Sequence, residues 1–178
     1  MFFKFNRETV FKIIRYTLLL LLLLLLQTSV FPPLAVFGST PNLFVVAVAC
    51  VAATDGEYSG MVFGLAAGLL WGGVCGTPYM LSGLLWALVA YFGGALITIL
   101  MKRGFITGMI LAVCTALLQQ VVCAFYALSI WRGFDMAYFL TRIALPEFVY
   151  TLALAPAVYG LVHLFNYRRK QSRKRYKI

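Results

Sequence analysis

Residues 16–31 read YTLLLLLLLLLQTSVF, and every position from Leu18 to Leu26 is leucine. A helix that crosses a hydrocarbon core about 30 Å thick needs roughly 20 predominantly apolar residues. Basic residues precede this run, and Pro32 and Pro33 follow it closely. The basic flank and the leucines mimic a signal peptide, but a convincing cleavage site of small residues is missing. We therefore expect a retained first transmembrane helix.

The composition of the whole chain also indicates a membrane protein. Of its 178 residues, 63% are hydrophobic and 11% are charged, whereas a typical soluble domain carries about a quarter charged residues. The mean hydropathy is +0.93, and so few polar groups cannot cover such a chain in water. These values exclude a soluble enzyme, a disordered chain and a secreted disulfide scaffold. They predict an all-α integral membrane protein.

Further apolar segments predict a compact bundle of about six transmembrane helices. The second segment is short and lies between Pro41-Asn42 and Asp55-Gly56-Glu57, so it needs neighbouring residues or a thinner bilayer to span. A stretch of charges and aromatic residues before the last segment is expected at the membrane interface. The six expected spans are Tyr16–Phe31, Phe44–Ala53, Ser59–Cys75, Tyr79–Leu100, Phe105–Ile130 and Phe148–Phe165.

The basic residues predict the orientation of the chain. There are 15 Lys and Arg residues against 5 Asp and Glu residues, a net charge of +10. They gather at the ends of the apolar segments, which is a topology signal and not a nucleic-acid-binding pattern. With six spans, thirteen of the fifteen lie on the side of the two tails, while Arg132 and Arg142 lie on the other. The positive-inside rule then places the N- and C-termini in the cytoplasm.

Three regions follow from these spans. We expect a basic cytoplasmic N-tail over residues 1–15, a six-helix transmembrane domain over residues 16–165 and a basic cytoplasmic C-tail over residues 166–178. Both tails are expected to attract anionic lipids, since basic residues next to a membrane bind negatively charged headgroups. Nucleic acid is not an expected partner.

The third segment carries a glycine at every fourth position. Successive glycines at this spacing shift by only about 40° around a helix, so they form a slanting stripe. Such a stripe lets another backbone approach closely, either within the bundle or in a partner protein. We favour packing within the bundle, because every small bundle needs close contacts. The glycines are Gly60, Gly64, Gly68, Gly72 and Gly76.

Four polar residues interrupt the apolar segments. Gln27, Gln119 and Gln120 need hydrogen-bond partners in the bilayer, and we interpret them as contacts between helices. Glu147 follows Pro146 at the expected start of the sixth helix, where an acidic residue is favourable. An intramembrane carboxylate relay is the alternative interpretation of Glu147.

No catalytic pattern stands out in the sequence. The four cysteines lie in or beside apolar runs without a C-x-x-C pair, and we interpret them as packing residues. Metal-dependent phosphotransfer at Asp55 and Glu57 would need further carboxylates on the same side of the membrane. The sequence also lacks the H-E-x-x-H, G-x-S-x-G and P-loop motifs. We expect a protein that is not an enzyme and that has no cofactor or metal site, with an uncharacterised membrane enzyme as an unfavoured possibility.

Short motifs along the chain occur in an order that resembles a known family. Gln27-Thr28-Ser29 ends the first helix, and Pro41-Asn42-Leu43 opens the second. The later motifs are Gly64-Leu65-Ala66-Ala67-Gly68-Leu69-Leu70, Gly76-Thr77-Pro78, Tyr91-Phe92-Gly93-Gly94, Leu145-Pro146, Thr151, Pro156 and Tyr159. From Tyr16 to Phe165 the chain is similar to the MreD family of bacterial rod-shape-determining membrane proteins. That family usually has an aspartate at the position of Gly72.

This resemblance implies a multi-pass scaffold of the bacterial cytoplasmic (inner) membrane, within the cell-elongation complex that maintains rod shape and directs peptidoglycan synthesis. The implied direct partner is the bitopic protein MreC. Through MreC, the chain would connect to MreB filaments, the RodA glycosyltransferase and a class B penicillin-binding transpeptidase.

The alternative is the substrate-binding S component of an energy-coupling-factor vitamin transporter, which is also a small six-helix protein. Those subunits tend to carry an Ala-x-x-x-Ala contact in their first helix. In this chain, the first helix is almost unbroken leucine.

Overall fold

A computed structural model describes residues 7–35, 39–75, 80–100, 104–130 and 135–175. Every element within these residues is helical, which confirms the all-α prediction for the described part of the chain. The elements are α1 (Arg7–Leu25), the π-helical turn η1 (Leu26–Val30), the short 3-10 turn η2 (Pro32–Leu34), α2 (Leu43–Asp55), α3 (Glu57–Cys75), α4 (Met80–Leu100), α5 (Phe105–Ile130), α6 (Met136–Phe139), the π-helical turn η4 (Leu140–Ala144) and α7 (Leu145–Arg175).

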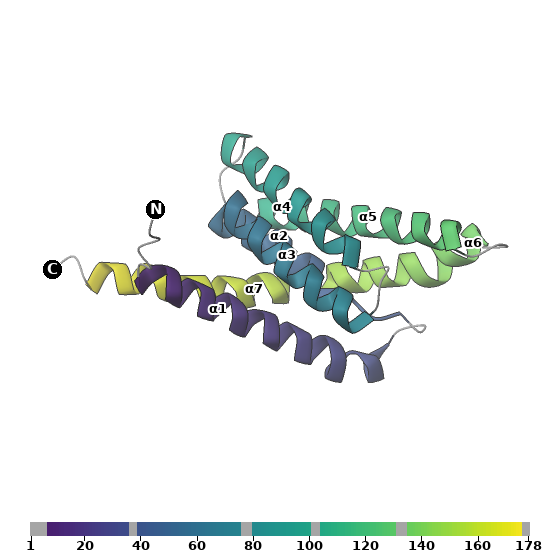
Figure 1. The fold of residues 1–178 in the computed structure, drawn as a ribbon, viewed down its shortest axis with the longest axis horizontal. Helices are drawn as coiled ribbons and strands as arrows, with labels where there is room; N and C mark the ends of the chain where they lie inside the picture. Colours follow the sequence, from purple (N-terminus) through teal and green to yellow (C-terminus); the bar gives the residue numbers. More distant parts are fainter. Residues whose placement is uncertain (1–6, 36–38, 76–79, 101–103, 131–134, 176–178) are drawn as a thin grey trace.

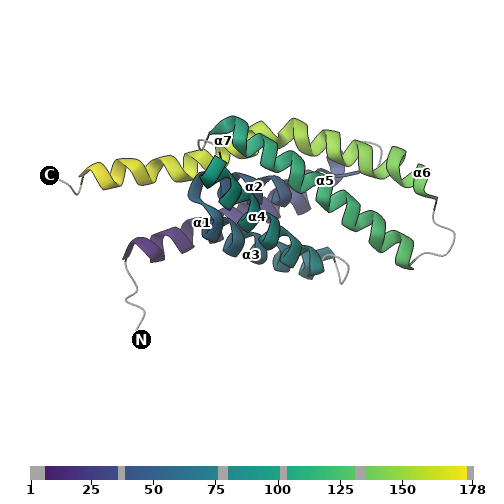
Figure 2. The same ribbon diagram turned by 90° about the horizontal axis from the view of Figure 1, so that it is seen from above.

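Helix α2 occupies the centre of the bundle. Every residue from Leu43 to Ala53 is at most 2% exposed, and α2 packs against α3, α4, α5 and α7 (Figures 1 and 2). Three leucines of α1, Leu19, Leu20 and Leu23, join the same core. A helix of 13 residues is only about 20 Å long, shorter than the hydrocarbon core. Enclosure by the other helices removes the need for α2 to match the bilayer.

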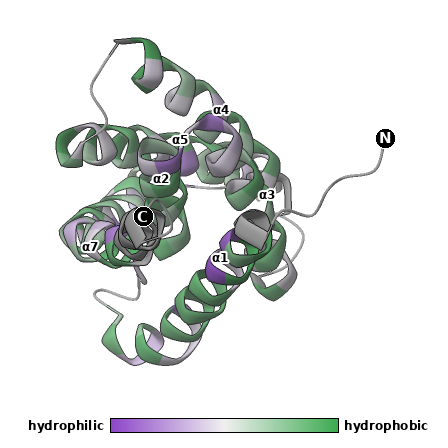
Figure 3. Ribbon diagram, turned by 90° about the vertical axis from the view of Figure 1, so that its left-hand side faces the viewer, coloured by the Kyte–Doolittle hydropathy of each residue, from purple (hydrophilic) through white to green (hydrophobic). Residues whose placement is uncertain are grey.

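The outer surface of the bundle is apolar, while several polar side chains are buried. Ile106 and Phe125 are each 71% exposed, whereas Gln27 and Gln119 are at most 3% exposed. Figure 3 shows that hydrophobic residues make up most of each helix. This inverted distribution suits a lipid environment, in which polar groups must find partners inside the protein. The chain therefore has the surface and the interior of a membrane protein.

Four segments among the described residues are long and apolar enough to cross a membrane. The short α2 is not one of them, and neither is α3, where glycines and a polar first turn lower the hydropathy. The start of α1 and the end of α7 lie at the same end of the bundle (Figure 1), which fits an even number of crossings. The count of six spans and the cytoplasmic location of both termini stay predictions. The four segments are Val10–Val30, Ser82–Ile99, Phe105–Ser129 and Met136–Leu164.

The helix boundaries differ most from the predicted ones in the basic tails. The predicted fifth span, Phe105–Ile130, coincides with α5. In contrast, α1 begins at Arg7 and α7 continues to Arg175, so much of both tails is helical. Lys and Arg are good helix formers, and each residue added to an existing helix gains one backbone hydrogen bond.

The predicted helix start at Pro146 and Glu147 coincides with the start of α7, whose first turn contains Glu147, but this start is not a free helix end. The chain is already helical from Met136, and it continues through η4 into α7 without a free end. The cap of this helical segment is Asp135, whose Oδ1 accepts a hydrogen bond from the N–H of Ala137 at 3.0 Å. Glu147 therefore lies inside a continuous helical segment.

Pro146 is accommodated within this helical segment by a side chain from another part of the chain. Proline has no N–H, so the carbonyl of Arg142, four residues earlier, loses its usual α-helical partner. The hydroxyl of Ser39 donates to the carbonyls of Arg142 at 3.5 Å and Ile143 at 3.3 Å. The wider π-helical turn η4 lies at the same place, as is common where an α-helix is locally disrupted.

Candidate functional site

The glycine stripe of α3 faces other helices of the same chain. A Cβ added to Gly60 would lie 2.5 Å from the Cβ of Ala52 in α2. A Cβ on Gly64 would lie 3.1 Å from the carbonyl oxygen of Trp86 in α4, and one on Gly68 would overlap the backbone of Gly83 in α4. These three glycines therefore form a seam with α2 and α4. Of the other two predicted glycines, Gly72 is buried and Gly76 lies outside the described residues.

The α4 side of this seam was not predicted from the sequence. On α4, Gly83, Ala87, Ala90 and Gly94 are all buried, and a Cβ on Gly94 would lie 2.8 Å from the Cα of Glu57 in α3. These small residues recur at intervals of four, three and four, which is the spacing of one helix face. The sequence carried that signal, although only the glycines of α3 were interpreted as a packing surface.

Gln27 supports the start of the central helix. Its Nε2 donates to the carbonyl of Pro41, and its Oε1 accepts from the N–H of Leu43 at 3.1 Å. The N–H of Asn42 donates to Oγ1 of Thr151 in α7 at 3.0 Å. The first N–H groups of a helix have no acceptor within the helix. Here the side chains of Gln27 in η1 and Thr151 in α7 accept hydrogen bonds from two N–H groups at the start of α2. These bonds connect three helical segments at one end of the bundle.

Gln119 joins α5 to α4. Its Oε1 accepts a hydrogen bond from Nε1 of Trp86 at 2.7 Å, and both side chains are at most 2% exposed. Its Nε2 lies 3.5 Å from Sγ of Cys123, one helical turn further along α5. The Gln119 amide therefore satisfies the N–H of the buried indole.

Gln120 lies beside Gln119 in sequence but points to a different region. It lines a groove of about 510 Å³ between α5 and the continuous segment formed by α6, η4 and α7. Gln120 is the polar residue of a lining that is otherwise apolar among the described residues. Glu147 of α7 lies next to the Gln120 amide and near Cys123. The main apolar side chains of the lining are Val121, Phe125, Leu128, Leu140, Leu145 and Phe148.

The oxygen of Gln120 has an unusual environment. Its Oε1 is buried and accepts no hydrogen bond from the part of the chain that the structure describes. A buried acceptor without a donor costs about 1–3 kcal/mol. Gln27 and Gln119 both have partners for their oxygens, so the three glutamines differ in how well their amides are satisfied.

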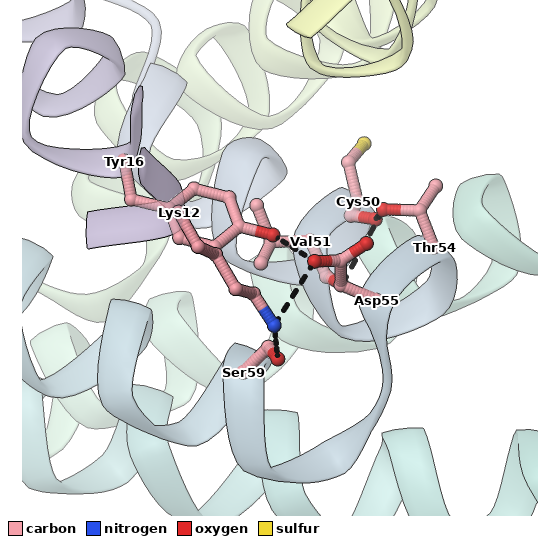
Figure 4. Close-up of polar contacts among 7 residues, drawn as sticks. All are labelled: Lys12, Tyr16, Cys50, Val51, Thr54, Asp55 and Ser59. Atoms are coloured by element: carbon pink, nitrogen blue, oxygen red, sulfur yellow. Dashed lines mark hydrogen bonds and ion pairs between the residues drawn. The ribbon is translucent and has the colours of Figure 1, made fainter. Parts of the chain in front are cut away.

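A polar cluster joins α1, α2 and α3 at the opposite end of α2 (Figure 4). The hydroxyl of Tyr16 donates to Oδ2 of Asp55, and Nζ of Lys12 lies 3.2 Å from the same oxygen. The same ammonium donates to Oγ of Ser59 at 2.6 Å. Lys12 lies in the expected N-tail, and its pairing with Asp55 was not predictable from the charge pattern alone. The available signal was the four-residue spacing of Lys12 and Tyr16, which places them on one helix face.

Asp55 and Glu57 are turned toward different helices. Between them, Gly56 has φ of 98°, a conformation that residues with a Cβ rarely adopt, and its N–H donates to the carbonyl of Ala52 at 3.1 Å. Glu57 then lies near α4, where Oγ1 of Thr98 donates to its Oε2 at 3.4 Å. The two carboxylates therefore serve separate helix contacts.

Comparisons with known proteins return no family model, no curated protein and no solved structure that matches this chain. Its function is therefore inferred from its own residues and contacts.

Proposed function

We propose that this chain is a non-enzymatic scaffold of the bacterial cytoplasmic membrane that binds the bitopic protein MreC in the cell-elongation complex. Through MreC it would be linked to MreB, RodA and a class B penicillin-binding transpeptidase, and its basic tails would contact anionic lipids. The proposal starts from the resemblance of its motifs to the MreD family. One structural observation supports it, which is the filled interior of the bundle.

The interior is filled because α2 lies at its centre. Phe44 of α2 and Trp86 of α4 are both fully buried, and Trp86 is bonded to Gln119. Interior side chains of this kind pack and bond with one another. The surface left for other molecules is the apolar outside of the helices, such as the exposed Leu88 of α4 and Phe125 of α5. Such a surface favours lateral association with another membrane helix, through close packing and occasional hydrogen bonds.

The proposal is tested by affinity purification from the bacterium that carries this chain. A tagged chain, expressed at its native level and extracted in mild detergent, is expected to recover MreC. An unrelated tagged membrane protein of similar size serves as the control. Depletion of the chain is expected to make rod-shaped cells round, as scored by microscopy.

Recovery of transporter ATPase subunits without MreC would contradict the scaffold and support the vitamin-transporter alternative. Normal rods after complete depletion would also contradict a role in cell elongation.

A further inference from the structure

Glu147 places a carboxyl group inside a candidate membrane span, Met136–Leu164. It lies one helical turn before Thr151 and two turns before Ala155, which are 2% and 0% exposed. Residues four apart share one face of a helix, so Glu147 lies on the face of α7 that packs into the bundle. A charge at such a position is costly, and ionisable residues inside a membrane are found beside a partner.

The partner of Glu147 is the amide of Gln120 in α5, a helix that packs against α7 (Figure 2). The Gln120 side chain hydrogen bonds to the Glu147 carboxyl. This contact joins two helices that both belong to candidate membrane spans. It lies within the chain, so no other molecule has to enter the bundle to complete it.

Glu147 has no positively charged partner within the residues that the structure describes. From α5, the titratable group near the carboxyl is the thiol of Cys123, which carries no positive charge. Helix α2 also packs against α7, but its charged residue, Asp55, is at the opposite end from its contact with Thr151. On its own helical segment, the nearest charged residue is Arg142, which is exposed. The surroundings therefore favour the neutral acid over the carboxylate.

The amide of Gln120 also fits a neutral acid better than a carboxylate. Its Oε1 is buried and accepts no hydrogen bond from the described residues. A carboxylate has only acceptors, so it can bind the amide N–H but cannot donate to this oxygen. A neutral carboxylic acid has one O–H donor and one carbonyl acceptor. It can accept from Nε2 and donate to Oε1 of the same amide, which satisfies both groups in a closed pair of hydrogen bonds.

We propose that Glu147 is a proton-binding site inside the membrane domain, which keeps its proton at neutral pH and joins α7 to α5 through two hydrogen bonds to Gln120. A glutamate in water is ionised at that pH. Release of the proton to water would leave a carboxylate facing the amide oxygen, and this repulsion would weaken the contact between α5 and α7. The bound proton thus controls a helix contact, whichever partner protein the chain has.

Infrared spectroscopy of the purified full-length chain detects this proton directly. At pH 7 we expect the carbonyl band of a protonated carboxylic acid in the wild-type chain and its absence in Glu147→Gln. Glu57→Gln is the matched control, because Glu57 accepts a hydrogen bond from Thr98 of α4 and takes no part in the pair. The band is expected to persist in that control. A wild-type chain without the band, or a band that persists in Glu147→Gln, would overturn the proposal.

Gln120→Leu tests the pairing itself. It leaves the acid without its amide partner, so the carbonyl band is expected to move to higher frequency, as it does when a carbonyl loses a hydrogen bond. Gln119→Leu is the same change one position away, at an amide that bonds Trp86, and it is expected to leave the band in place. An unmoved band in folded Gln120→Leu would refute the pairing. If Glu147→Gln does not fold, the shift in Gln120→Leu assigns the band.

The dependence of stability on pH measures the consequence for the fold. The folded chain holds a proton on Glu147 that the unfolded chain releases, so this site makes stability fall as the pH rises above about 4.3. Its contribution is at most about tenfold in the unfolding equilibrium constant per pH unit. Glu147→Gln replaces the neutral acid by an amide that cannot ionise, so it is expected to remove this contribution. A difference between the wild-type chain and Glu147→Gln that stays constant from about pH 5 to pH 7 would contradict the proton site.

Discussion

Gly68 of α3 and Gly83 of α4 lie backbone against backbone. A Cβ added to Gly68 would overlap the Cα of Gly83, and a Cβ added to Gly83 would lie 3.1 Å from the Cα of Gly68. Lipid is as apolar as the interior of the bundle, so helices in a membrane associate mainly through close packing and hydrogen bonds. Because neither glycine has a side chain, the backbones of α3 and α4 can approach each other closely at this point.

The first prediction concerns this contact. Gly68→Ala is expected to push α3 and α4 apart and to lower the free energy of unfolding by about 1–3 kcal/mol, as overpacking does. Gly73→Ala is the matched control in the same helix, because a Cβ there meets no atom within 4 Å. That control is expected to be neutral or slightly stabilising, since alanine favours helix. Thermal unfolding of the purified monomer in detergent measures both. Equal effects of the two substitutions would contradict the seam.

The second prediction concerns the buried pair of Trp86 and Gln119. Gln119→Leu leaves the indole N–H without an acceptor and is expected to destabilise the chain by about 1–3 kcal/mol. Trp86→Phe removes the donor, so adding Gln119→Leu to Trp86→Phe is expected to cost less than Gln119→Leu alone. A double-mutant cycle of unfolding free energies gives the coupling. Strictly additive effects would show that the hydrogen bond contributes nothing to stability.

The third prediction concerns the attachment of α1. Asp55→Ala removes the acceptor that Lys12 and Tyr16 share, and it leaves a partly buried ammonium without its counter-ion. It is expected to lower the thermal midpoint, while Lys12→Met added to it recovers part of the loss, because unpaired buried charge is the main cost. Limited proteolysis of α1 provides a second measurement. A double variant that is less stable than Asp55→Ala would contradict this explanation.

The fourth prediction concerns orientation. Reporter domains fused after Lys102 and after Ile178 are expected to behave as cytoplasmic, and one fused after Phe37 as external. The reason is the excess of Lys and Arg at one set of helix ends, which the positive-inside rule assigns to the cytoplasm. An external reporter after Ile178 would contradict six spans with both termini inside.

Helix type and approximate position were predictable from the sequence. The apolar segment Phe105–Ile130 and the helix α5 have the same boundaries, because a backbone in lipid must satisfy its N–H and C=O groups within each helix. The four-residue glycine spacing on α3 likewise indicated a packing surface. The continuation of helix through Pro146 was not predictable from local rules, because it involves Ser39, more than a hundred residues away.

The partners of the polar residues could not be predicted in the same way. Gln27, Gln119 and Gln120 have the same side chain in apolar helices, yet their contacts differ. The first supports α2, the second bonds Trp86, and the oxygen of the third has no donor among the described residues. These differences depend on how distant helices are rotated and shifted against one another.

The sequence by itself determined that the chain is helical, apolar and suited to a membrane, because hydropathy and backbone hydrogen bonding act locally along each segment. Only the tertiary structure decided that α2 lies at the centre, that Gly68 faces Gly83 and that Gln120 faces the groove. The physical reason is that lipid and protein interior are equally apolar. A membrane helix therefore carries no strong hydrophobic pattern to mark its inner face, and the fit of small residues and hydrogen bonds between helices selects that face instead.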